Sequence, residues 1–231
     1  MKKYLICFLA VVLSTVNLFA QPDYSSITFK SKLHEYKTKK PDLTAVDFDK
    51  SNLKELLQLL GSKFYSDTEI NDITDRIWLS FTDPEKFDFV FKDLAIQTQP
   101  NWNKKNARGQ IILEPNPFLA EWTQSDGELQ YLQQALANIL SYYNLMAYSE
   151  DAISTKKSIS KLLFTRKMTF KPATSGDWTN SYLKYVNSIV KPKGYTALIS
   201  EGGYDFLICK TTDVNALEDL LIKLKWHFTE P

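Results

Sequence analysis

Two acidic residues near the end of the chain are the first candidates for chemistry. Glu201 and Asp205 lie on either side of Gly202-Gly203, with apolar runs before and after this stretch. A glycine pair between two apolar runs predicts a β-hairpin, which would place both carboxylates at one rim of a sheet. Paired carboxylates are the groups that carry out glycoside hydrolysis. Turns also favour acidic residues where no reaction takes place, so a purely structural role is the alternative for both candidate catalytic residues.

Three tryptophans are candidates for ligand binding. Trp102, Trp122 and Trp178 fall in or beside predicted loops. Flat aromatic rings in loops can line a groove for a sugar or a peptide. The alternative is that the three rings close the ends of the hydrophobic core.

A Ser-x-x-Lys pattern occurs twice on one predicted helix, at Ser154–Lys157 and at Ser158–Lys161. Serine acyl-enzymes that process the cell wall use this spacing, because the lysine lies one helical turn from the serine and can take its proton. The pattern recurs at Ser51–Lys54, and Lys210–Thr212 lacks the glycine of the partner motif. These observations favour a chance match in a chain rich in serine and lysine.

Other motifs for chemistry are missing from the sequence. It contains no glycine-rich phosphate loop, nucleophile elbow, paired-histidine zinc helix or calcium loop. Its two histidines, His34 and His227, are far apart, so we expect neither a metal site nor a cofactor. The formal net charge is +1, which offers no electrostatic basis for binding nucleic acid.

The beginning of the chain predicts export. Lys2 and Lys3 precede an apolar segment, Tyr4–Val16, and Leu18–Ala20 forms a plausible cleavage site. The apolar segment is too short to cross a bilayer, so residues 1–20 are predicted to be a signal peptide that directs the protein to a periplasm or the cell exterior. An uncleaved anchor is the alternative, and no membrane span is expected after cleavage.

Cleavage would leave Cys209 as the one cysteine, which excludes a disulfide within the remaining chain. Cys209 alternates with apolar residues and is predicted to be a buried, unreactive side chain. Residues 21–48 carry several lysines and few apolar residues, which predicts an extended leader. Residues 49–231 are predicted to form a single domain.

Hydrophobic periodicity predicts more helices than strands in this domain. A polar break is expected over 97–106, and the end of the chain is predicted to form a hairpin–helix–strand (ββαβ) unit. The class is therefore a helix-rich α+β domain. The expected helices cover 49–60, 67–81, a segment from 83, 125–143, 151–164, 178–189 and 213–224, and the expected strands cover 111–113, 195–199, 204–209 and 226–228.

The order of three segments resembles a family of bacterial domains of unknown function. These segments are Asp83–Phe87, the predicted helix Leu129–Leu140, and Tyr204–Ile208 with the helix and strand that follow. The resemblance covers most of residues 49–228. The chain departs from the family in its signal peptide and lysine-rich leader, and the resemblance implies no activity and no site residues.

The leading hypothesis is an exported, non-catalytic binding or protein-interaction module whose partner is a protein or an envelope glycan. It rests on the missing catalytic motifs, the near-neutral charge and the many aromatic residues. The alternative is a hydrolase of envelope sugar or peptide that uses Glu201 and Asp205. An inhibitor of a toxin or enzyme in the same compartment is a third hypothesis.

Overall fold

The structure is a computed structural model that describes residues 43, 46–91, 98–105, 107, 111–115, 127–174 and 178–231. The predicted signal peptide, residues 1–20, lies outside the described residues, as does nearly all of the predicted leader, 21–48.

The described residues contain seven α-helices and six strands, which confirms the predicted helix-rich α+β class. Four strands form one antiparallel sheet in the order β3-β5-β4-β6, and β1 and β2 form a separate hairpin. The predicted ββαβ unit is β4, β5, α9 and β6. The bounds are α2 (Lys50–Gly61), α3 (Asp67–Thr82), α4 (Pro84–Val90), β1 (Thr98–Lys105), β2 (Ile111–Pro115), α6 (Gly127–Tyr142), β3 (Met146–Tyr148), α7 (Ala152–Ile159), α8 (Thr179–Val190), β4 (Tyr195–Ser200), β5 (Asp205–Lys210), α9 (Val214–Ile222) and β6 (Phe228–Thr229).

Local capping sets the starts of the first helices. At α2 the Asp49 side chain accepts a hydrogen bond from the backbone N–H of Asn52 at 2.8 Å, and the Asn52 side chain accepts one from the Asp49 N–H at 3.2 Å. Ser66 and Glu69 form the same reciprocal box at α3. Such boxes satisfy N–H groups that have no partner inside the helix.

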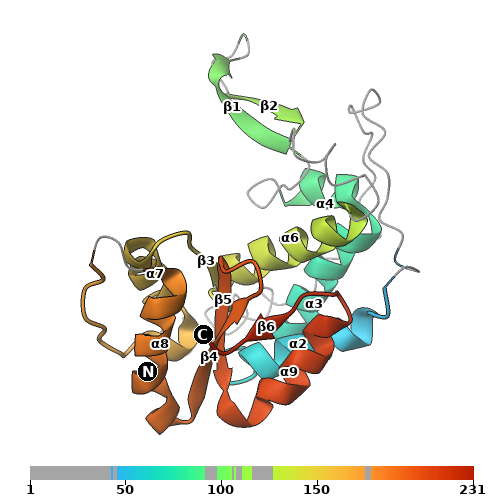
Figure 1. Ribbon diagram of the computed structural model, residues 1–231. Coiled ribbons are helices and arrows are strands. Elements are labelled where there is room, and N and C mark those ends of the chain that lie inside the picture. The colour runs from blue at the N-terminus through green and yellow to red at the C-terminus, as the bar shows by residue number, and fades with distance from the viewer. Residues whose placement is uncertain are drawn as a thin grey trace, which may run out of the picture. The chain divides into compact units, whose positions relative to one another are not determined.

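The central strands β4 and β5 are buried on both faces. Successive side chains of a strand point to opposite faces. Leu198 and Leu207 belong to a core built with α2, α3, α6 and α9, whereas Ala197 and Phe206 belong to a second core built with α7 and α8. Figure 1 shows the sheet between these two sets of helices. The continuous apolar runs that predicted the hairpin therefore reflect helices on both faces of the sheet.

Two strands lie where the sequence predicted none. Residues 97–106 were expected to be a polar break, but Thr98–Lys105 forms β1 and pairs with β2. Proline, asparagine and lysine disfavour strands, so β1 depends on its partner strand and carries little signal of its own. β3 has only three residues, which is too short to show an alternating pattern.

The helix predicted over 151–164 ends early, at Ile159. The carbonyl of Ile159 accepts a hydrogen bond from the Thr165 hydroxyl, and the Leu163 N–H donates to the carbonyl of Asn144 at 3.1 Å. These contacts with residues outside the helix replace the bonds that would have continued it.

Gly61 is the last residue of α2, and the backbone at the following Ser62 is right-handed. A Cβ at Gly61 would lie 3.0 Å from Cδ1 of Ile70 and 3.3 Å from a ring carbon of Tyr65. Gly61 therefore permits the close approach of α2 and α3.

Cys209 is buried in β5, as predicted. Burial, followed by the nearby carboxylates of Asp213, Glu218 and Glu230, raises the pKa of its thiol to about 12. The thiolate is the reactive form, so its population at pH 8 is roughly a thousandfold below that of an ordinary thiol.

We therefore expect Cys209 in folded protein comprising residues 21–231 to resist a thiol reagent such as DTNB. The same protein unfolded in urea should react fully within minutes. The absorbance of the released thiolate measures both rates. Rapid reaction of the folded protein would contradict the buried environment of Cys209.

Candidate functional site

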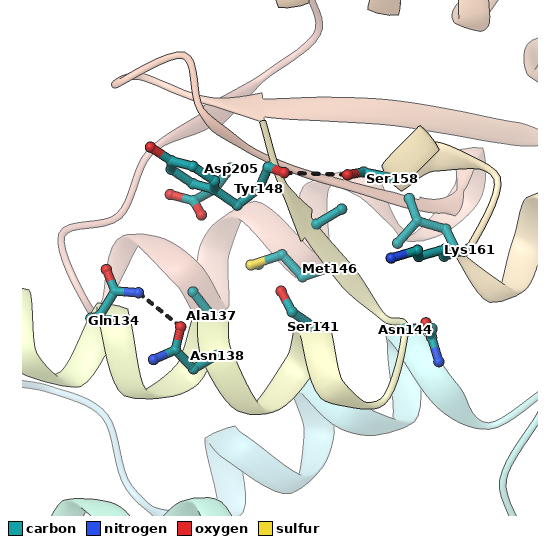
Figure 2. Close-up of a pocket in the computed structure, with 12 residues that line it drawn as sticks. Gln134, Ala137, Asn138, Ser141, Asn144, Met146, Tyr148, Ser158, Lys161 and Asp205 are labelled. Atoms are coloured by element: carbon teal, nitrogen blue, oxygen red, sulfur yellow. Dashed lines mark hydrogen bonds between the residues drawn. The ribbon is translucent and has the colours of Figure 1, made fainter. Parts of the chain in front are cut away.

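A pocket of about 480 Å³ lies between α6 and β3. Its lining comes from four parts of the chain that pack together here: α6, β3, the end of α7 and the first residue of β5. Figure 2 shows the pocket with α6 along one side and with Asp205 and Lys161 on opposite sides. The lining residues are Gln134, Ala137, Asn138, Ser141, Asn144, Met146, Ala147, Tyr148, Ser158, Lys161, Leu162 and Asp205.

One face of α6 supplies the polar side of the pocket. Gln134, Asn138 and Ser141 are spaced by four and three residues, which places them on the same face of a helix. The Gln134 amide donates to the Asn138 side-chain oxygen at 2.9 Å. The opposite face of α6 carries core residues such as Leu136 and Leu140. The helix therefore holds amide and hydroxyl groups in fixed positions beside the pocket.

The turn after α6 positions β3 beside the pocket. Asn144 adopts a left-handed conformation with φ of 56°. The N–H of Leu145 donates to Leu140 at 2.9 Å, and the N–H of Asn144 donates to Ser141 at 3.0 Å. This is the Schellman arrangement that ends many helices, and asparagine tolerates its left-handed position. The chain therefore reverses and returns beside α6 as β3.

Asp205 supplies an acidic group at one side of the pocket. It pairs with Tyr148 across β3 and β5, so both side chains point to the face of the sheet that α6 covers. Burial raises the pKa of the Asp205 carboxyl to about 6. Within the described part of the chain, no hydrogen bond or ion pair to this carboxylate is present, so it is available to a ligand.

Two tyrosines border Asp205. The rings of Tyr148 and Tyr204 lie 5.9 Å apart, and both side chains are exposed. The Tyr148 hydroxyl donates to Glu150 at 2.6 Å, and this bond is the main reason that the pKa of Tyr148 is raised to about 12. Asp205 is thus the one carboxylate of the described lining, and two aromatic rings lie beside it, an arrangement that favours a cation.

Lys161 supplies the opposite charge on the other side of the pocket. It follows the end of α7, and its ammonium group makes no ion pair with any described residue. Ser158 also lines the pocket, and its hydroxyl donates to the carbonyl of Tyr148 at 3.4 Å. Because α7 ends at Ile159, Lys161 lies beyond the helix. The Lys161 N–H donates to the Ser158 carbonyl at 3.0 Å, which keeps the two residues one turn apart, but within the described residues no hydrogen bond joins the Ser158 hydroxyl to the Lys161 ammonium group.

The predicted site residues fall in different places. Asp205 lines the pocket, whereas Glu201 lies exposed in the turn after β4 and is not part of the lining. Trp178 precedes α8, is 75% exposed and does not line the pocket either. Trp102 belongs to β1, but its side chain is outside the description, and Trp122 lies wholly outside the described residues.

Sequence reasoning missed the polar residues of α6 and the contribution of β3. The sequence did contain a signal for the polar residues of α6, because Gln134, Asn138 and Ser141 form a polar stripe on an otherwise apolar helix. Such a stripe is typical of a solvent-facing surface as well as of a site. No local signal indicated that β3 would return beside this stripe.

Among the described residues, no group of three or more histidine, cysteine, aspartate or glutamate side chains is arranged to hold a metal ion. None of the helices in the described ranges is long and apolar enough to cross a bilayer. Comparison of the chain with models of protein families, with curated proteins and with solved structures finds no match. The resemblance to a bacterial family therefore stays a prediction.

Proposed function

We propose that this protein is an exported, non-catalytic binding module and that its ligand occupies the pocket between α6 and β3. The observation that carries the proposal is the position of two opposite charges, Asp205 and Lys161, which have no partner among the described residues and lie across a pocket with amide groups along one side. Pockets of this size commonly hold small molecules or short polymer segments. Export rests on the sequence of residues 1–20.

A hydrolase of envelope sugar or peptide is the second candidate. The raised pKa of Asp205, about 6, suits a group that donates a proton near neutral pH. Glycoside hydrolysis uses two carboxyl groups, and among the described lining residues Asp205 alone carries one. Its neighbour Glu150 hydrogen bonds to Tyr148. The pocket is therefore better equipped to bind a charged ligand than to cleave one.

A pocket-filling variant tests the binding proposal. Asn138 is exposed on α6, so Asn138→Trp can fill the pocket without disturbing the core. Lys184→Trp introduces the same side chain at an exposed position on α8 and serves as the matched control. The ¹⁵N-labelled protein, residues 21–231, is titrated with a panel of charged dipeptides, pentapeptides and amino sugars, and amide resonances are followed by NMR.

We expect at least one probe to shift resonances of Ser141, Met146 and Lys161. Asn138→Trp should weaken the affinity for that probe by at least about tenfold, and Lys184→Trp should bind the probe with the affinity of the parent protein. A panel that leaves all pocket resonances unmoved would contradict the proposal. Turnover of a probe that Asp205→Asn abolishes would favour the hydrolase.

A further inference from the structure

The two sides of the four-stranded sheet carry opposite charge. Residues 152–193, which contain α7 and α8, hold nine basic residues and one acidic residue, Asp177. Residues 46–91, which contain α2, α3 and α4, hold five basic and ten acidic residues. α7 and α8 pack on one face of the sheet, and α2 and α3 pack on the other (Figure 1). The near-neutral charge of the chain is therefore the sum of a positive side and a negative side.

Most basic residues of the positive side, called here the α7–α8 side, have no acidic partner. Lys191 forms an ion pair with Glu230. The other eight form no ion pair with any described residue, and the Nζ of Lys171 lies 4.3 Å from the centre of the Tyr185 ring. Like charges on one side repel one another, and an anionic surface relieves this repulsion. The eight are Lys156, Lys157, Lys161, Arg166, Lys167, Lys171, Lys184 and Lys193.

Two large apolar side chains are exposed at one end of the α7–α8 side. Trp178, a predicted ligand-binding residue, directly precedes α8, and Ile153 lies in the first turn of α7. Both are more than half exposed, at 75% and 59%. The starts of the two helices lie together, because the hydroxyl of Thr155 donates to that of Thr179 at 3.3 Å. Exposed tryptophan and isoleucine near lysines are typical of surfaces that enter the interface of a membrane.

The acidic groups near these helix starts already have partners within the protein. Asp151 caps α7 and accepts hydrogen bonds from the N–H groups of Ile153 and Ser154 at 2.8 and 2.9 Å. Glu150 accepts one from the Tyr148 hydroxyl at 2.6 Å. With both included, residues 150–193 still hold nine basic residues against three acidic ones. The dominant charge of this side is therefore positive.

We infer that the α7–α8 side binds the surface of a membrane that contains anionic lipids, with Trp178 and Ile153 in the headgroup region and the lysines beside the lipid phosphates. Lysines near such a surface each add to the affinity, and salt weakens their contribution. A soluble anionic polymer would pair with the lysines but would leave the two apolar side chains in water. The inference goes beyond the proposed function, and its test changes residues that do not line the pocket.

The test measures how protein comprising residues 21–231 sediments with lipid vesicles. One set of vesicles is phosphatidylcholine alone, and the other contains equal parts of phosphatidylcholine and phosphatidylglycerol. The variants are Lys157→Gln with Lys184→Gln, Trp178→Ser, and, as a matched control outside the α7–α8 side, Lys54→Gln with Lys225→Gln. All five positions are exposed, so the variants should unfold at the urea concentration of the parent. The lysine-rich leader is present in every protein and contributes equally.

We expect the parent to bind the phosphatidylglycerol vesicles at least about tenfold more tightly than the phosphatidylcholine vesicles, and less tightly as salt rises. Lys157→Gln with Lys184→Gln should weaken this binding by about tenfold or more, and the control pair by less than about twofold. Trp178→Ser should weaken it by about fivefold. Lipids brominated in their acyl chains should quench the fluorescence of the parent more than that of Trp178→Ser.

Three results would overturn the inference. The first is that the parent binds neither kind of vesicle, or binds both equally. The second is an equal loss in the control pair and in the pair on α7 and α8. The third is that Trp178→Ser binds and is quenched as the parent is, which would identify a soluble anionic polymer, such as polyphosphate, as the fitting partner. None of these results bears on the pocket, which Asn138→Trp and small soluble probes test separately.

Discussion

Replacement of Asn187 by leucine is expected to lower the free energy of unfolding by about 2–4 kcal/mol. Asn187 is buried on α8, and its side chain bonds both backbone groups of Ala197 on β4. The Ala197 N–H donates to Oδ1 at 2.7 Å, and Nδ2 donates to the Ala197 carbonyl at 3.1 Å. These groups face the side of β4 on which β6 pairs, but β6 reaches only Ile199 and Ser200. The asparagine therefore takes the place of a missing strand.

Leucine at position 187 would leave both backbone groups of Ala197 buried and unpaired, at about 1–3 kcal/mol each, and its apolar contacts would offset only part of that loss. Urea denaturation at pH 7.5 measures the change. The matched control is Asn180→Leu, which makes the same substitution at an exposed position of the same helix and should stay within about 0.5 kcal/mol of the parent. Hydrogen exchange of the Ala197 amide should accelerate in Asn187→Leu only. A loss below about 1 kcal/mol would contradict the role assigned to Asn187.

Replacement of Asp205 by asparagine is expected to raise the free energy of unfolding at pH 8 by about 1–2 kcal/mol. Burial raises the pKa of Asp205 from 3.8 to about 6. The folded state therefore binds a proton more readily than the unfolded chain, and stability falls as pH rises between these two values. The difference between the folded and unfolded pKa values of Asp205 corresponds to about 3 kcal/mol of stability. Partial exposure of the side chain reduces this contribution.

The sign of this effect gives a clear test. At pH 8, about two pH units above the pKa of Asp205, the carboxylate is almost fully charged and destabilising, so Asp205→Asn should be more stable than the parent. At pH 4 the parent carboxyl is largely protonated in the folded protein, and most of the difference should vanish. Urea denaturation at both pH values measures it, with Glu201→Gln, at the exposed acid of the same hairpin, as the control. An equal gain at both pH values would show that ionisation of Asp205 is not the cause.

Together with the binding experiment, this variant would show stability and function opposing each other at one residue. A half-buried carboxylate without a partner destabilises the fold, and such residues are commonly kept for binding or catalysis. Asp205→Asn should therefore be more stable and bind a positively charged probe less well. A variant that changed packing alone would not produce both results.

Local signals were sufficient for most of the helices. Leu53, Leu56 and Leu57 follow the helical period, and Asp49 and Ser66 cap α2 and α3 through residues three positions away. The hairpin of β4 and β5 was also predictable, since Gly203 takes the positive φ of 79° that its turn requires. In each case the determining residues lie within one or two turns of each other in the sequence.

What the sequence determined by itself was therefore the set of long helices, the C-terminal ββαβ unit and the buried character of Cys209. The tertiary structure alone decided that β3 exists, because this short strand is stabilised by β5, a partner distant in sequence, whereas β1 depends on its pairing with the neighbouring β2. It also decided the pocket. The polar stripe of α6 and the acid at the start of β5 are each typical of an ordinary surface, and they line one pocket only because the Asn144 turn returns β3 between them.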